Sequence, residues 1–179
     1  MSHTQNNLLK LCIAAMFAAL ICVATLVIQI PIPMGYINFG DCFILVGAWI
    51  LGPVYGGAAA AIGSAMADIL TGYLIYAPAT FVIKGLIAVI AAILTKTLIS
   101  HIKKYSNISY IIAAAVGECA MIVGYYLYDA FIMGYGITGA FAGVIGNSVQ
   151  GAAGIVSGCL MILLITKTGV LKKLSFYKT

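Results

Sequence analysis

The acidic residues of this sequence lie where an ordinary soluble protein would not have them. All four acids, Asp41, Asp68, Glu118 and Asp129, fall inside or at the ends of long apolar runs, and Lys84 lies in such a run as well. An ionisable group near the centre of a bilayer costs at least ~2.5–3.5 kcal/mol, so such groups usually face a bundle interior, pair, or line a pathway. These five residues therefore predict buried ion pairs or a polar site inside an apolar protein.

One predicted helix gathers several of these groups on a single face. Glu118, Tyr125 and Asp129 are spaced by seven and four residues, and Tyr128 lies nearby on the outer half of the same helix. Residues at these spacings share one side of a helix. A carboxylate as deep as Glu118 has no inexpensive structural explanation, so we expect it to contact a ligand.

A second helix carries uncharged polar groups in a stripe formed by Gly143, Asn147, Gln150 and Gly154. Glycines let backbones approach closely, and two amides project from the same surface. Amides bind a polar ligand without requiring it to be charged. The alternative is hydrogen bonding between helices, worth about 0.6 kcal/mol on average in one well-studied membrane protein; we favour a site.

The other charged residues have structural alternatives. A short loop joins the segments of Asp68 and Lys84, so an ion pair across this hairpin would satisfy both without a ligand. Asp68 orienting Lys84 toward a ligand is an equal alternative. For Asp41, at the start of its segment, we expect helix capping, since Asp suits a helix N-terminus as acceptor and by charge.

The composition fixes the class of protein. Hydrophobic residues make up 64% of the 179 residues and charged residues only 7%, whereas an ordinary soluble domain is about 25% charged. Apolar runs of roughly 20 residues cross a bilayer as helices. We predict an all-α integral membrane protein, one domain over residues 1–179, with six transmembrane helices at about 8–30, 38–52, 55–72, 78–99, 109–130 and 138–166. The second is short and is expected to be tilted or partly re-entrant.

The lysines predict the orientation, because the sequence has no arginine. Eight of the nine lysines flank the N-terminus, the loop "SHIKKYSN" and the C-terminal tail, whereas the loops "PIPMGYIN", "TGYLIYAPA" and "FIMGYGITG" have none. The positive-inside tendency then places both termini in the cytoplasm, those three loops outside, and the chain in the cell membrane. The net charge of +5 is attributed to topology and attraction to anionic lipid, with no nucleic-acid partner.

Motifs for catalysis and metal binding are not found in the sequence. There is no GxxxxGK[ST] phosphate loop, GxSxG elbow or HExxH pair, and five scattered cysteines form no CxxC pair. We therefore expect no enzyme activity, no metal and no cofactor in this chain.

Small residues predict close helix contacts. Ala14, Ala15, Ala18 and Ala19 form interleaved AxxxA spacings on the first helix, which let helices touch closely. They serve either internal packing or docking of another membrane protein.

The segment "INFGDCFILVGAWILGPVYGGAAAAIGSAMADILTGYLIYAPATFVIKGL", residues 37–86, resembles the substrate-binding S component of an energy-coupling factor (ECF) vitamin transporter. The resemblance is to the subfamily that includes hydroxymethylpyrimidine and pyridoxine transporters. It rests on "GD", "LGPxxG", "GSAxAD" and "APATxxIKG" in that segment, and "GYYLYDAF" and "IGNSVQ" extend it over nearly the whole chain.

The resemblance implies a six-helix bundle that captures a vitamin or vitamin precursor outside. A separate module of two ATPase subunits and a transmembrane coupling protein would then deliver it inward, so ATP is used by the partners. It also implies docking through the AxxxA alanines, and a site in the outer half covered by "PIPMGYIN", with Tyr36 as an aromatic contributor. The expected substrate-binding residues are Tyr36, Asp68, Lys84, Glu118, Tyr125, Tyr128, Asn147 and Gln150. Trp49 is the only tryptophan and lies toward the cytoplasmic end, which departs from sites that stack a ligand on tryptophan.

Two other functions are compatible with the residues. A stand-alone secondary transporter or channel would use the buried acids as proton or cation relays, although the sequence shows no internal repeat of the kind common in such proteins. A membrane scaffold without a ligand would use the AxxxA face alone.

Overall fold

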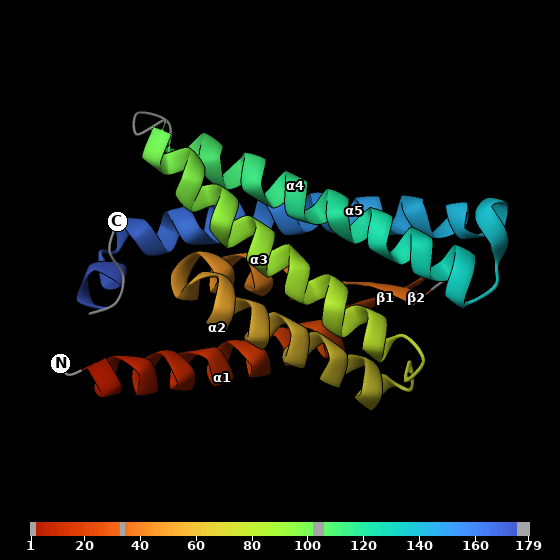
Figure 1. The fold of residues 1–179 in the computed structure, drawn as a ribbon, viewed down its shortest axis with the longest axis horizontal. Coiled ribbons are helices and arrows are strands. Elements are labelled where there is room, and N and C mark those ends of the chain that lie inside the picture. The colour runs from red at the N-terminus through yellow and green to blue at the C-terminus, as the bar shows by residue number, and fades with distance from the viewer. Residues whose placement is uncertain (1–2, 33–34, 102–105, 175–179) are drawn as a thin grey trace.

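The structure is a computed structural model that describes residues 3–32, 35–101 and 106–174. Figure 1 shows a bundle of long helices: α1 (His3–Val27), α2 (Gly40–Thr71), α3 (Ala77–His101), α4 (Ser106–Leu127) and α5 (Gly136–Lys167). Within the described part, five helical spans are long and apolar enough to cross a membrane, the fourth running from α4 through residue 132. The all-α membrane class expected from composition therefore holds.

Helix α2 contains a sharp break. Gly52 has a φ of +80° and Pro53 follows it. Glycine adopts positive φ without a steric penalty, and proline cannot continue the hydrogen-bond ladder. A Cβ added to Gly56 would lie 2.8 Å from the Ala48 Cα atom, so the two arms of α2 fold back against each other. The six expected helices are thus not all separate: segments 38–52 and 55–72 are the two arms of α2.

A β-hairpin follows α1, where the sequence predicted helix to residue 30 and then a loop. Strands β1 (Gln29–Ile32) and β2 (Gly35–Asn38) pair antiparallel, with Gln29 opposite Asn38 and Ile30 opposite Ile37. The hairpin lies toward the end of the bundle opposite the start of α1 (Figure 1). Most of the expected covering loop "PIPMGYIN" is therefore strand; its Pro33 and Met34 lie outside the described residues.

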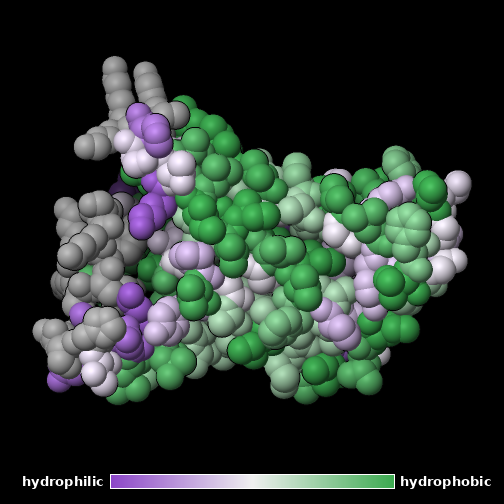
Figure 2. Space-filling view, viewed as in Figure 1, coloured by the Kyte–Doolittle hydropathy of each residue, from purple (hydrophilic) through white to green (hydrophobic). Residues whose placement is uncertain are grey.

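The surface and the interior of the bundle differ in residue size. Large apolar side chains are exposed, such as Val54 and Ile132 at 75% and 70%, and Figure 2 shows an apolar surface over the middle of the molecule. A membrane protein exposes such side chains to lipid. The interior contains many alanines, including the fully buried Ala60, Ala88 and Ala114, so the helices approach closely.

The AxxxA alanines of α1 divide between two directions. Ala14 is buried, and a Cβ added to Gly63 of α2 would lie 2.4 Å from the Ala18 carbonyl oxygen. Ala15 and Ala19 are exposed. Ala14 and the backbone of Ala18 therefore serve packing inside the bundle, and Ala15 and Ala19 face outward; docking of a partner on these alanines stays a prediction.

Two short elements complete the chain. The π-helix η2 (Tyr128–Ile132) continues α4, and the 3-10 helix η3 (Val170–Lys173) follows α5. Single π turns inside helices frequently occur at functional sites, and η2 carries the buried Asp129. The start of α1 and the end of α5 lie at the same end of the bundle (Figure 1); that this end is cytoplasmic stays a prediction.

Candidate functional site

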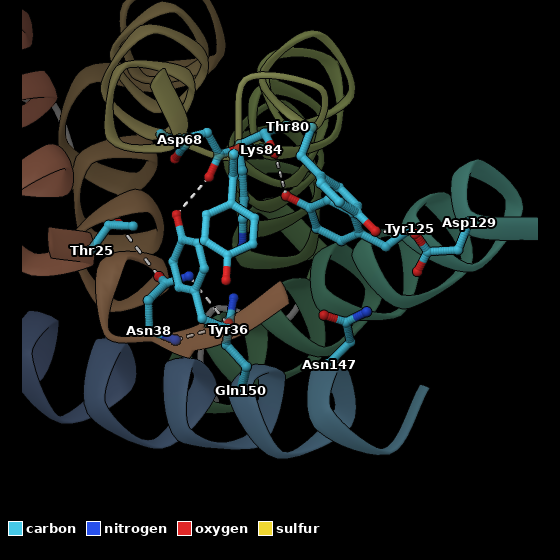
Figure 3. A pocket seen from close by; sticks show the side chains of 13 residues that line it. Thr25, Tyr36, Asn38, Asp68, Thr80, Lys84, Tyr125, Asp129, Asn147 and Gln150 are labelled. Atoms are coloured by element: carbon cyan, nitrogen blue, oxygen red, sulfur yellow. Dashed lines mark hydrogen bonds between the residues drawn. The ribbon is translucent and has the colours of Figure 1, made fainter. Parts of the chain in front are cut away.

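A polar pocket opens near the β-hairpin, among the ends of the helices (Figure 3). Helices α1 to α5, β2 and η2 all contribute to its wall. The lining residues are Thr25, Tyr36, Asn38, Ser64, Asp68, Tyr73, Tyr76, Thr80, Lys84, Tyr125, Asp129, Asn147 and Gln150.

Buried polar side chains form a network that we call the floor, consisting of Asp41, Lys84 and Gln150. The Lys84 Nζ atom donates to Asp41 Oδ1 at 2.6 Å, and the Gln150 Nε2 atom donates to Asp41 Oδ2 at 2.6 Å. All three residues are buried. The floor therefore joins α2, α3 and α5 with a fully bonded carboxylate at its centre.

The floor corrects two predictions from the sequence. The salt bridge of Lys84 is with Asp41 and not with Asp68. Asp41 does not cap α2, because its two carboxylate oxygens bind Lys84 and Gln150. The Asn38 side chain accepts from the Gly40 N–H instead, at 2.9 Å.

Hydrogen bonds of Asn38 hold strand β2 at the pocket. The backbone N–H of Asn38 donates to Gln150 Oε1 at 3.0 Å, and Asn38 Nδ2 donates to the same oxygen at 3.2 Å. The Thr25 hydroxyl of α1 donates to Asn38 Oδ1 at 3.4 Å. The hairpin is thus bonded to α5 and α1 beside the floor, as Figure 3 shows.

Two tyrosine–aspartate pairs form what we call the rim, consisting of Tyr36, Asp68, Tyr76 and Asp129. The Tyr36 hydroxyl donates to Asp68 Oδ1 at 2.5 Å, and the Tyr76 hydroxyl donates to Asp129 Oδ1 at 2.8 Å. Burial first, and then the accepting carboxylates, raise the pKa of both tyrosines above the usual value. Both hydroxyls therefore stay protonated and remain donors at physiological pH.

Aromatic rings connect the two pairs of the rim. The ring of Tyr73 lies 5.0 Å from that of Tyr36 and 6.4 Å from that of Tyr76, between centroids. On the other wall, the Tyr125 hydroxyl and Thr80 Oγ1 are hydrogen-bonded at 2.9 Å, and Lys84 Nζ lies 5.8 Å from the Tyr125 ring centroid. Aromatic faces of this kind stack on flat rings and attract cations.

Two polar atoms of the wall are buried without a hydrogen-bond partner in the described part of the chain. These are Asp68 Oδ2 and Ser64 Oγ. Buried polar groups are nearly always bonded, and an exception calls for a specific explanation. Because both residues line the pocket, a molecule bound there would supply the hydrogen-bond partners that these two atoms lack.

The pocket brings together six of the eight side chains predicted from the sequence, and their role in binding stays a prediction. These six are Tyr36, Asp68, Lys84, Tyr125, Asn147 and Gln150. Glu118 and Tyr128 are not among the lining residues. Sequence reasoning missed Thr25, Asn38, Ser64, Tyr73, Tyr76, Thr80 and Asp129 as wall residues.

Glu118 lies beside the floor, close to Asp41. It is 2% exposed, and neither of its carboxylate oxygens has a hydrogen-bond partner within the described residues. A Cβ added to Gly154 would lie 2.9 Å from Asp41 Cβ and 3.2 Å from Glu118 Oε1. Glycines at 151 and 154 therefore make the room in which Glu118 fits.

Tyr128 packs against Tyr76 of the rim but is not among the residues that line the pocket. Its hydroxyl donates to the Ile75 carbonyl oxygen at 2.5 Å, and its ring lies 5.6 Å from that of Tyr76. It thus holds the α2–α3 connection and Tyr76 in place. Of the missed residues, Asp129, Tyr73 and Tyr76 had a signal, since all three are polar or aromatic groups at one predicted membrane face; Thr25 and Ser64 had none.

Comparisons with known proteins agree with this architecture. Residues 5–167 match the family model described as the ECF-type riboflavin transporter, S component. An uncharacterised protein of Pyrococcus woesei is 38% identical over 138 residues, which cover 76% of this chain and 87% of that protein.

A solved structure shares the fold. The S component of a bacterial ECF transporter superposes with a TM-score of 0.68, covering 92% of this chain and 97% of that chain at 22% sequence identity. The family match spans most of the chain, and the shared fold accounts for the helices that build the pocket. The chain therefore belongs to the family of ECF-type riboflavin transporter S components, the substrate-binding membrane subunits of ECF transporters.

Proposed function

We propose that this chain captures a small polar heterocycle, a B-vitamin or vitamin precursor of the pyridoxine or hydroxymethylpyrimidine kind, at the outer face of the cell membrane. A separate transmembrane coupling protein and two ATPase subunits then drive its delivery inward. The observation that carries the proposal is the pocket itself, where every long helix contributes at least one polar or aromatic side chain and amides, carboxylates and tyrosine rings converge.

The pocket wall suits a flat ring with polar edges. Ligand sites combine apolar or aromatic faces with a few polar groups that fix orientation. The rings of Tyr36, Tyr73 and Tyr125 provide faces, and Asn147 and Asp68 provide hydrogen-bonding edges. None of the hydrogen bonds described above uses the Asn147 amide, so this side chain is the simplest candidate to read the edge of a ligand.

The β-hairpin is suited to act as the cover of the site. It is held through the Tyr36–Asp68 bond to α2 and through the Asn38–Gln150 bonds to α5. These few polar contacts are the ones that must separate for a ligand to enter from the hairpin side. A loop held in this way gates access and excludes water when closed.

Riboflavin is the second candidate substrate, because the description of the matching family names it. It is a larger, three-ring heterocycle with a polyol chain. A binding panel that includes both kinds of compound separates the two candidates directly.

Coupling to the ATPase module is proposed to use the exposed part of α1. Replacing Ala15 and Ala19 with Leu should abolish energised uptake while leaving ligand affinity unchanged, because both residues face outward and lie outside the pocket wall. Equal uptake by the double variant would contradict this docking site. Substrate uptake into vesicles that lack ATPase partners would favour the stand-alone transporter instead.

The test of the proposed function is a thermal-shift panel on the detergent-purified protein with pyridoxine, hydroxymethylpyrimidine, thiamin and riboflavin. A ligand that binds only the folded state raises the apparent Tm. We expect a large rise with one compound, and a smaller rise for Asn147→Ala. No rise with any vitamin would contradict the proposal.

A further inference from the structure

The charges around the pocket do not balance. All four acids of the chain lie in or next to the pocket: Asp68 and Asp129 line it, Asp41 belongs to the floor, and Glu118 lies beside Asp41. Lys84 is the one lysine among the lining residues. The Lys84–Asp41 pair is the single salt bridge found in the described ranges, so the one lysine of the pocket wall is already paired with the carboxylate of the floor.

The two carboxylates of the wall are bonded by neutral hydroxyl groups. Asp68 receives the Tyr36 hydroxyl and Asp129 receives the Tyr76 hydroxyl. These bonds supply donors but no positive charge. A charge removed from water is stabilised far better by an opposite charge than by neutral donors alone.

One carboxylate oxygen of Asp68 can still accept a hydrogen bond. The residue is 5% exposed, and its Oδ2 atom has no hydrogen-bond partner in the part of the chain that the structure describes. A buried acceptor without a donor carries its full desolvation penalty. Because Asp68 lines the pocket, a donor brought by the ligand removes that penalty.

The rings between the two acids point to the kind of donor. Tyr36, Tyr73 and Tyr76 follow one another with centroids 5.0 and 6.4 Å apart, and the first and last bind Asp68 and Asp129. Aromatic faces attract ammonium groups through their quadrupole. A line of tyrosines with a carboxylate at each end is a surface for an organic cation.

We infer that the ligand of this pocket is a cation, an aromatic heterocycle with a protonated amino group that binds Asp68 beside the Tyr36 and Tyr73 rings. This inference rests on the proposed function, because it concerns the ligand of the same pocket. A neutral heterocycle offers Asp68 only a hydroxyl or ring N–H. A hydrogen bond within an ion pair is stronger than one to a neutral donor, and the difference corresponds to about tenfold in affinity.

The test uses matched ligand pairs that differ only at one substituent. Pyridoxamine carries an ammonium group where pyridoxine carries an alcohol, and 4-amino-5-aminomethyl-2-methylpyrimidine differs in the same way from its hydroxymethyl analogue. Isothermal titration of the purified full-length protein should show the ammonium member of at least one pair binding about tenfold more tightly.

Two variants test whether Asp68 causes the preference for the ammonium member of a pair. Asp68→Asn keeps an acceptor for Tyr36 but removes the charge, so the preference for the ammonium member should fall to about even. Ser64→Ala is the matched control, because it removes an uncharged group of the same wall and should weaken both members of a pair equally.

Each outcome decides between the claims. Equal or tighter binding of the alcohol member, or a preference that survives Asp68→Asn, overturns the inference and leaves the proposed function in place. Failure of both pairs, thiamin and riboflavin to bind contradicts the proposed function and the inference together.

Discussion

The floor and the rim of the pocket contain the same kinds of residue but use them differently. At the floor, both carboxylate oxygens of Asp41 are bonded at 2.6 Å, one to Lys84 and one to Gln150. At the rim, Asp68 and Asp129 are bonded by tyrosine hydroxyls, and one oxygen of Asp68 is left without a partner.

This difference separates structural from binding roles. The floor joins α2, α3 and α5, segments that are distant in the sequence, and its groups are already satisfied by one another. The rim joins the hairpin and η2 to the ends of neighbouring helices, and one carboxylate oxygen of its Asp68 can still accept a hydrogen bond. Substitutions at the floor should therefore change stability first, and substitutions at the rim should change ligand binding first.

The largest effect is expected from Lys84→Met. This variant leaves the Asp41 carboxylate buried without its cation, and breaking a buried pair in this way costs about 3–5 kcal/mol. The free energy of unfolding, measured by SDS titration in mixed micelles, should fall by that amount.

The double variant Asp41→Asn/Lys84→Met is the control for charge. It removes the orphaned carboxylate and retains an acceptor for Gln150, so most of the lost stability should return. A double variant as unstable as Lys84→Met would show that the lysine acts through packing and not through the ion pair.

A somewhat smaller effect is expected from Gly154→Ala, which tests how tightly the floor is packed. The new Cβ would lie 2.9 Å from Asp41 Cβ, and overpacking typically costs about 1–3 kcal/mol. Ala152→Ser, on the exposed side of the same helix, should stay within about 0.5 kcal/mol of the parent protein. Equal behaviour of the two variants would mean that the floor yields easily.

Glu118→Met should move stability in the opposite direction. Glu118 is buried and both oxygens lack partners, so an apolar side chain of similar length should raise the free energy of unfolding by about 1 kcal/mol. The same SDS titration measures it. If the variant instead loses ligand affinity, Glu118 contacts the ligand, as its position in the sequence predicted.

Tyr36→Phe, which removes the hydrogen bond from the hairpin to Asp68, is expected to affect ligand release more than stability. The free energy of unfolding should fall by about 0.5–1.5 kcal/mol. The dissociation rate of the bound ligand, measured by stopped-flow, should rise several-fold because the cover is held less firmly. An unchanged rate would show that the Tyr36–Asp68 bond does not hold the ligand in the pocket.

The sequence predicted the membrane helices well because apolar length is a strong local signal. The segment expected at 78–99 is α3 at Ala77–His101, and the segment expected at 138–166 is α5 at Gly136–Lys167. The hairpin was missed because each strand has only four residues and prolines interrupt the segment. Such short strands have no periodicity to detect.

The pairing of charges was predicted less well, because it depends on tertiary packing. Asp68 is closer to Lys84 in the sequence, yet the first arm of α2 brings Asp41, 43 residues away, to the lysine. Asp129 was placed on the correct face but was not expected in the site. The π turn at Tyr128–Ile132 shifts residues around the helix axis, and a regular helical pattern does not reveal it.

The most direct test of this pocket as the substrate site is the affinity of Asn147→Ala for the vitamin that raises the Tm in the panel. Asn147 lines the pocket and takes no part in the floor or rim networks, so its truncation should leave the Tm of the ligand-free protein unchanged. We predict a dissociation constant about tenfold higher by isothermal titration, the value of one lost hydrogen bond to a ligand. An unchanged dissociation constant in a folded variant would contradict the assignment of this pocket as the substrate site.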